Sequence, residues 1–142
     1  MHDVPVLLVE DDSLDAKTLR RAFAHNKITN PLHVVTDGED ALSFLRHEAP
    51  FEDPDAAPRP GLILLDLNLP RLTGREFLGV IKKEPEFQTI PTIVLTTSDE
   101  RSDVDETYAM GIAGYIKKPL DFAEFVEAIR RVELYWSICT LP

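Results

Sequence analysis

Short apolar runs alternate along the chain with segments whose apolar residues recur at helical spacing. The runs predict five β-strands, and the third of them, LILL at residues 62–65, has no polar interruption. A run of this kind is typical of a central parallel strand that is covered on both faces. The second run is half polar, so we expect it nearer an edge of the sheet. The predicted strands span residues 4–9, 32–36, 62–65, 92–95 and 114–116.

A helical pattern follows each of the five strands. The last is the clearest, because Asp121 and Glu124 form a capping-box-like start before apolar residues recur at helical spacing. Strands that alternate with helices build a parallel sheet through right-handed crossovers, so the pattern predicts a doubly wound (βα)5 α/β fold. The helices are marked by Leu14, Leu19, Ala22 and Phe23; by Ala41, Leu42 and Leu45; by Phe77, Leu78, Val80 and Ile81; by residues 103–110; and by Phe122, Phe125, Val126, Ile129 and Val132.

Length and composition fit one acidic domain with a real hydrophobic core. The chain has 142 residues, of which 44% are hydrophobic, and a formal net charge of -10. Nucleic acids and anionic membranes bind basic patches, so this charge argues against both as main partners. No apolar segment approaches the roughly 20 residues of a membrane span. The single cysteine, Cys139, excludes an intrachain disulfide and favours a reducing compartment, which we expect to be the cytoplasm.

Polar side chains follow the strands at the edge where ligands bind in doubly wound folds, beyond the carboxyl ends of the strands. The first strand ends in Glu10 and Asp11 and the third in Asp66. The fourth ends in Thr96 and Thr97 and the fifth in Lys117 and Lys118. Each residue alone has an ordinary role, in a turn, in a strand or as a solvated charge. Together, at successive strand ends of one edge, they predict a site.

Three carboxylates, a hydroxyl and an ammonium at one edge predict phosphoryl chemistry with a divalent cation. Clustered carboxylates repel one another unless a cation compensates their charge, and an oxygen-rich site of this kind suits Mg²⁺. The threonine and the lysine are then free to hold a phosphoryl group beside the metal. The nucleophile would be a carboxylate, which gives an aspartyl phosphate.

These residues, in this order, resemble the receiver domain of two-component response regulators from about Val4 to Val132. The matching motifs are LLVED at 7–11, LLDLNLP at 64–70, VLTT at 94–97 and GYIKKP at 114–119. Asp66 precedes Gly74 by 8 positions, Thr96 by 30 and Lys118 by 52. The four motifs and Gly74, five elements in order and in register, make the resemblance specific.

The resemblance implies a flavodoxin-like three-layer sandwich with strand order 2-1-3-4-5. It also implies that Asp66 is the phosphoryl acceptor and that Mg²⁺ is the cofactor. The implied metal ligands are Glu10, Asp11, Asp66 and the backbone carbonyl of Asn68.

The same resemblance assigns the contacts to the phosphoryl group. Lys118 and Thr96 contact it, and Tyr115 turns inward as Thr96 closes. This movement changes the partner affinity of the surface formed by the fourth helix, fifth strand and fifth helix. Lys117 points elsewhere by strand alternation, and the peptide bond before Pro119 is expected to be cis.

The implied phosphoryl donor is a phosphohistidine on a sensor histidine kinase, and we expect a signalling protein that is not an enzyme. A receiver at residues 1–134 leaves residues 135–142 as an apolar C-terminal extension and no output domain. We therefore expect a diffusible messenger, a phosphorelay intermediate or a phosphate sink. The proline-rich loop at 48–60, the LTTS motif at 95–98 and the extension resemble the single-domain regulators that partner phytochrome-type light-sensing kinases.

Two interpretations of the apolar extension are open. Exposed contiguous aromatic residues usually mark an interface, so we expect a homodimer through the fifth helix and the extension. The alternative is that the extension folds back on its own core or frays. The candidate interface residues are Phe125, Ile129, Val132, Tyr135, Trp136 and Ile138.

The main rival function is a phosphohydrolase that also forms an aspartyl phosphate. Hydrolases of the dehalogenase type carry a second aspartate two positions after the nucleophile, where this chain has Asn68. A P-loop nucleotide enzyme is excluded because the chain has no Gly-x-x-x-x-Gly-Lys run. The intact acceptor, acidic pair, threonine and lysine also argue against a degenerate receiver that binds partners without phosphorylation.

Overall fold

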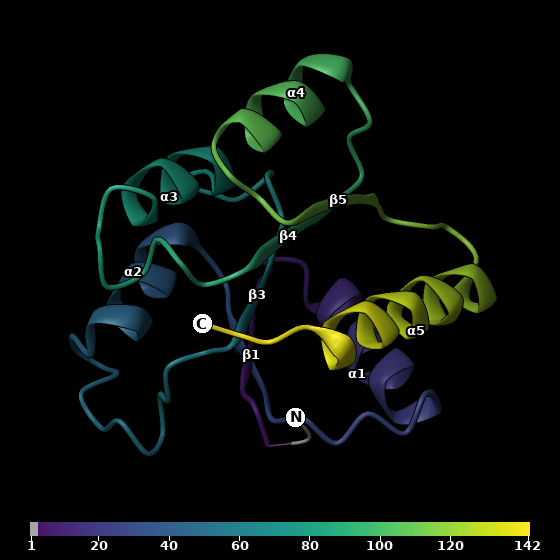
Figure 1. Cartoon of the computed structure of the whole chain (residues 1–142), viewed down its shortest axis with the longest axis horizontal. Coiled ribbons are helices and arrows are strands. Elements are labelled where there is room, and N and C mark those ends of the chain that lie inside the picture. The colour runs from purple at the N-terminus through teal and green to yellow at the C-terminus, as the bar shows by residue number, and fades with distance from the viewer. Residues whose placement is uncertain (1–2) are drawn as a thin grey trace.

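The computed structural model describes residues 3–142. It contains a five-stranded parallel sheet that lies between two layers of helices (Figure 1). The strand order is β2-β1-β3-β4-β5, which confirms the predicted flavodoxin-like topology. The strands are β1 (Val6–Val9), β2 (Leu32–Val35), β3 (Leu62–Leu65), β4 (Thr92–Thr96) and β5 (Gly114–Lys117).

Helices α1 and α5 cover one face of the sheet, and α2 and α3 cover the other, with α4 on the same side as α3 (Figure 1). Each predicted helix is present, and the boundaries differ from the sequence-based ones by a few residues at most, except at the end of α5. The helices are α1 (Ser13–His25), α2 (Gly38–Arg46), α3 (Gly74–Ile81), α4 (Arg101–Ala109) and α5 (Phe122–Ile138).

The alternation of side chains along β1 builds two cores at once. Leu7 and Val9 are buried with the α2 and α3 side chains, whereas Val6 and Leu8 are buried with those of α1 and α5. β1 and β3 run in register, with Val9 opposite Leu65. The residues that follow these two strands, at the carboxyl edge of the sheet, are therefore brought side by side.

Side chains that end the preceding loops fix where the helices begin. Asp12 accepts the backbone N–H groups of the second and third residues of α1, at 2.9 and 3.2 Å. Asp121 caps α5 in the same way, as its position before the apolar pattern predicted. α3 begins with a reciprocal capping box between Thr73 and Glu76, which the sequence analysis missed.

The C-terminal extension is not a separate segment, because α5 continues through it to Ile138. Trp136 is only 5% exposed and packs in the core cluster under α1 and α5, together with Phe125 and Ile129. Prediction of these three side chains as dimer contacts is therefore wrong: the extension folds back on its own core. Tyr135 and Ile138 point outward and are 55% and 83% exposed.

The described chain has its cis X-Pro bond at Ala49–Pro50, and the predicted cis bond before Pro119 is wrong. The trans form of an X-Pro bond is favoured by only about 0.5–1 kcal/mol, so tertiary contacts choose the isomer and the motif does not dictate it.

Residues 48–60 form the predicted loop, anchored where Nε2 of His47 donates to the carbonyl of the buried Ala57 at 2.8 Å. Within residues 3–142, no helix is both long and apolar enough to cross a bilayer.

Candidate functional site

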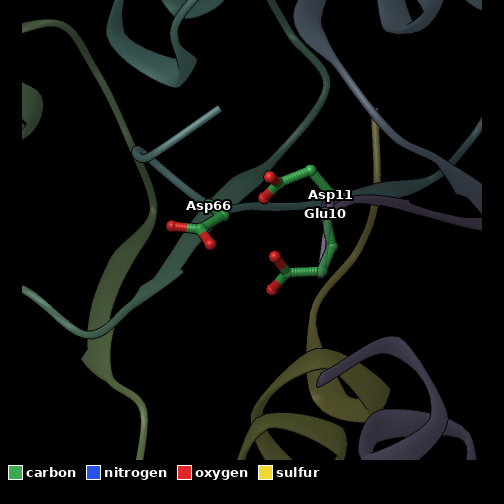
Figure 2. A group of neighbouring side chains, drawn as sticks. All are labelled: Glu10, Asp11 and Asp66. Carbon is green, nitrogen blue, oxygen red and sulfur yellow. The ribbon is translucent and has the colours of Figure 1, made fainter. Parts of the chain in front are cut away.

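Three carboxylates converge between the ends of β1 and β3, as predicted (Figure 2). Glu10 and Asp11 follow β1, and Asp66 follows β3; each offers an oxygen within 4.8 Å of the others. Glu10 and Asp66 are buried, at 3% and 6% exposure, whereas Asp11 is exposed. The cluster is thus open to solvent on the side of Asp11.

The carboxylate of Asp66 is held by donors on both oxygens. Its Oδ1 accepts the hydroxyl of Thr96 at 2.9 Å and the backbone N–H of Asn68 at 3.1 Å. Its Oδ2 accepts the ammonium of Lys118 at 3.0 Å. Thr96 is the last residue of β4 and Lys118 directly follows β5, so four strand ends supply this one site. The structure therefore brings together the residues that the strand-end argument singled out.

Lys118 also contacts two further carboxylates, one of which the sequence analysis missed. Its Nζ lies 2.5 Å from Oε1 of Glu10 and 2.8 Å from Oδ2 of Asp15. Asp15 lies in the first turn of α1, where an acidic residue is ordinary because it complements the helix dipole. Only its spacing from the acidic pair could have signalled this role, because that spacing brings the Asp15 side chain over the edge of the sheet.

The pKa values of the two buried carboxyl groups shift in opposite directions. Burial raises the pKa of Glu10 to about 7, although Lys118 partly offsets the effect. Burial would also raise the pKa of Asp66, but the Asn68 N–H and the charge of Lys118 outweigh it, and the net shift is downward. Burial opposes the charge of Lys118, yet its hydrogen bonds to Asp15 and Glu10 raise its pKa. Asp66 is therefore ionised and able to act as a nucleophile at neutral pH.

The loop after Asp66 is fixed by close packing against its own backbone and against α2. A Cβ on Gly74 would lie 2.2 Å from the carbonyl oxygen of Asp66, so only glycine fits there. The carboxylate of Asp37, which also caps α2, accepts the guanidinium of Arg71 from the same loop. Asp37 is 2% exposed, and its ion pair was not predicted, because its sequence context fits a turn.

Two side chains near the site point away from the acidic cluster. Tyr115 is half-buried against the core on the α3 side, and its hydroxyl donates to the carbonyl of Ser98 at 2.8 Å. Lys117 forms an ion pair with Asp99 at 3.0 Å and is largely exposed, as strand alternation predicted. Lys118 is thus the lysine of the pair that serves the site.

The donor set fits a small, hard divalent cation. Carboxylate and carbonyl oxygens are the ligands such ions prefer, and a cation would compensate the mutual repulsion of the three carboxylates. Oxygens of Glu10, Asp11 and Asp66 are close enough together to share one ion, and the exposed side of the cluster leaves room for water ligands.

The chain belongs to the response regulator receiver domain family, which it matches over residues 6–130. The response regulator Rcp1 of Synechocystis sp. is 36% identical over 138 residues, which cover 96% of this chain and 92% of Rcp1.

Three solved structures of response regulators share the fold over 98–99% of the chain. The response regulator RPA3017, in red light signalling of R. palustris, superposes with a TM-score of 0.92 at 35% identity and covers 98% of both chains. The phosphorylated cyanobacterial phytochrome response regulator RcpA gives a TM-score of 0.90 at 35% identity over 99% of both chains. The Mn²⁺-bound form of Rcp1 gives 0.88 at 36% identity and covers 98% of this chain and 99% of that one.

Proposed function

We propose that this protein is the phosphoacceptor of a two-component pathway and takes a phosphoryl group from a sensor histidine kinase onto Asp66. The observation that carries the proposal is the environment of that carboxylate. Asp66 is buried and ionised, with Thr96 and Asn68 donating to one oxygen and Lys118 to the other. With a phosphoryl group attached there, Lys118 would neutralise its oxygens and the Thr96 hydroxyl would donate a hydrogen bond to them.

The transfer forms one bond and breaks one. An oxygen of Asp66 attacks the phosphorus of a phosphohistidine, an O–P bond forms, and the N–P bond breaks with its electron pair left on the imidazole nitrogen. The imidazole then takes up a proton from water. Lys118 and Thr96 orient the phosphoryl oxygens, and no group of this chain needs to act on a separate substrate. This is why we infer a phosphoacceptor and not an enzyme.

We propose that Mg²⁺ is the cation of the acidic cluster. Glu10, Asp11, Asp66 and the backbone carbonyl of Asn68 would hold it, and it would neutralise charge on the phosphoryl oxygens. The Mn²⁺-bound structure of Rcp1, at 36% identity, supports a divalent ion of this kind.

We infer that phosphorylation reorganises the surface of α4, β5 and α5. Thr96 already donates to Asp66. Two residues further along the chain, the carbonyl of Ser98 accepts the hydroxyl of Tyr115. A phosphoryl group at Asp66 would redirect the Thr96 hydroxyl, and the Ser98–Tyr115 bond is the contact through which that change would reach β5.

The pathway we propose is a light-sensing one with a phytochrome-type kinase. RcpA is a phytochrome response regulator and RPA3017 acts in red light signalling, and both match this chain over nearly its full length. A cytoplasmic location is part of the same proposal.

We further propose a homodimer through α5. With Phe125, Ile129 and Trp136 committed to the core, the remaining contact residues are Val132, Tyr135 and Ile138. A groove between β5 and α5 adjoins them, and its lining is apolar except for Arg131: Ile93, Ala113, Gly114, Ile116, Ala128, Arg131, Val132 and Tyr135.

The experiment that tests the pathway is phosphotransfer from a purified phytochrome-type kinase labelled on its histidine with radioactive phosphate. We expect the label to leave the kinase and appear on this chain within minutes in the presence of Mg²⁺. Retention of the label on the kinase, with acetyl phosphate still able to phosphorylate the chain, would contradict the pathway and leave the phosphoacceptor role standing.

A further inference from the structure

The ammonium of Lys118 is shared among three carboxylates. It lies 2.5 Å from Glu10, 2.8 Å from Asp15 and 3.0 Å from Asp66, and its side chain is 8% exposed. A lysine ammonium has three N–H donors and no acceptor, so each donor is used by a different residue.

Two of these three partners, Glu10 and Asp66, also have proposed roles of their own in the site. Glu10 and Asp66 belong to the acidic cluster that suits a cation, and Asp66 is the proposed acceptor. Asp15 is outside that cluster. It is therefore the one partner of Lys118 that neither a cation nor a phosphoryl group would draw away.

We propose that Asp15 is a positioning residue for phosphoryl transfer, which anchors the Lys118 ammonium beside Asp66 from the α1 side. The proposal rests on the phosphoacceptor function of Asp66. Asp15 touches neither the acceptor nor the phosphoryl group and acts through the lysine alone.

The position of Asp15 is fixed by the local chain. Its own backbone N–H donates to the capping carboxylate of Asp12 at 3.2 Å, and Asp12 directly follows the acidic pair Glu10–Asp11. The start of α1 therefore holds Asp15 at a set place relative to the cluster. From there its side chain, 37% exposed, spans to the loop after β5 and binds Lys118.

Replacement of the Asp15 carboxylate by a neutral amide leaves Lys118 with Glu10 and Asp66 as its charged partners, because an amide oxygen accepts a weaker hydrogen bond than a carboxylate. The shorter contact, to Glu10, would then draw the ammonium toward β1, away from the place where phosphoryl oxygens must be met. Partners that orient metal ligands typically change metal affinity or activity by about 10–100-fold when removed, and Asp15 would orient Lys118 in the same manner. We expect the maximal phosphorylation rate of Asp15→Asn to fall about tenfold, in line with the lower end of that range.

The test compares Asp15→Asn, Asp15→Glu and the control Glu39→Gln in the full chain. Glu39 is an exposed acid in the first turn of α2, so its variant removes the same charge from a similar place without touching Lys118. The rate of phosphorylation by acetyl phosphate is measured at saturating Mg²⁺ and saturating donor. We expect Asp15→Asn to be slow, and Asp15→Glu to recover most of the rate because its carboxylate still reaches the lysine. Glu39→Gln should match the wild type.

A wild-type rate in Asp15→Asn, an equal loss in Glu39→Gln, or an Asp15→Glu variant as slow as Asp15→Asn would each overturn the proposal. A second readout is the NMR signal of the Lys118 ammonium, assigned by its loss in Lys118→Arg. Asp15→Asn should shift this signal and speed its hydrogen exchange, and an unchanged signal would also overturn the anchor. If the wild type itself takes no phosphoryl group, the phosphoacceptor function fails, and this second readout still decides whether Asp15 holds Lys118.

Discussion

The hydroxyl of Thr96 donates a 2.9 Å hydrogen bond to Oδ1 of Asp66, and Thr96 is fully buried. This contact joins the end of β4 to the end of β3. With Lys118 on the other oxygen, it fixes the rotation of the acceptor carboxylate before any phosphoryl group arrives.

Thr96→Val keeps the shape of the side chain and removes its donor. A hydrogen bond to a charged group contributes about 1.5–3 kcal/mol, so we expect phosphorylation by acetyl phosphate to slow by about tenfold or more. The neighbouring Thr97 is exposed, and Thr97→Val serves as the matched control. Equal rates for the two variants would show that the Thr96 hydroxyl does not act on Asp66.

The affinity for Mg²⁺ should rise with pH through neutrality. Burial raises the pKa of Glu10 to about 7, so below that pH the folded protein carries a proton that a cation must displace. Calorimetric titration from pH 6 to pH 8 should show tighter binding at higher pH, with protons released on binding at the acid end. Glu10→Gln should remove most of the pH dependence, and an unchanged profile in this variant would contradict the assignment.

The same shift predicts how stability without metal depends on pH. Because the pKa of Glu10 is higher in the folded state than its ordinary value of 4.5, the folded state binds more protons in this range. Its contribution therefore favours folding at low pH and is lost as the pH rises from about 4.5 to about 7. Urea unfolding of the wild type and of Glu10→Gln over this range would measure the difference.

Tyr115→Phe removes the hydroxyl that donates to the carbonyl of Ser98 at 2.8 Å. We expect the free energy of unfolding to fall by about 0.5–1.5 kcal/mol, because the half-buried carbonyl loses its partner. Tyr108 is 48% exposed, and Tyr108→Phe should change stability by less than about 0.5 kcal/mol. If both variants unfold at the same urea concentration, the Ser98–Tyr115 bond does not support the loop after β4.

The proposed dimer depends on side chains that the monomer leaves outside. Light scattering should give twice the chain mass for the wild type, and the double variant Tyr135→Ser/Ile138→Ser should give the mass of one chain. Leu14→Ser, which changes an exposed leucine on α1, should remain a dimer. A monomeric wild type, or a double variant of unchanged mass, would exclude this interface.

The strand-end residues were predictable because a parallel sheet brings the carboxyl ends of its strands to one edge. Uninterrupted apolar runs such as Leu62–Leu65 mark the strands, and the polar residues that follow each run fall at that edge. Sequence order therefore placed Glu10, Asp66 and Thr96 together with the lysine pair Lys117–Lys118, and the resemblance to receiver domains singled out Lys118. The rule has no equivalent for residues on helices.

For that reason Asp15 was missed, and Trp136 was predicted as a dimer contact although it lies in the core. An acid in the first turn of a helix is common whether or not it reaches a site, so the contact of Asp15 with Lys118 depends on where α1 lies relative to the loop after β5. Trp136 follows the end of the obvious apolar pattern, and only the continuation of α5 turns it into the core. Both outcomes are decided by tertiary packing, which periodicity does not encode.

The central claim is tested most directly by the intact mass of the chain after incubation with Mg²⁺ and acetyl phosphate. We predict one phosphoryl adduct on the wild type and on the control Asp55→Asn, which changes an exposed loop aspartate. We predict none on Asp66→Asn, and none on the wild type when the metal is chelated. A wild type without an adduct, or an adduct that persists in Asp66→Asn, would contradict the account.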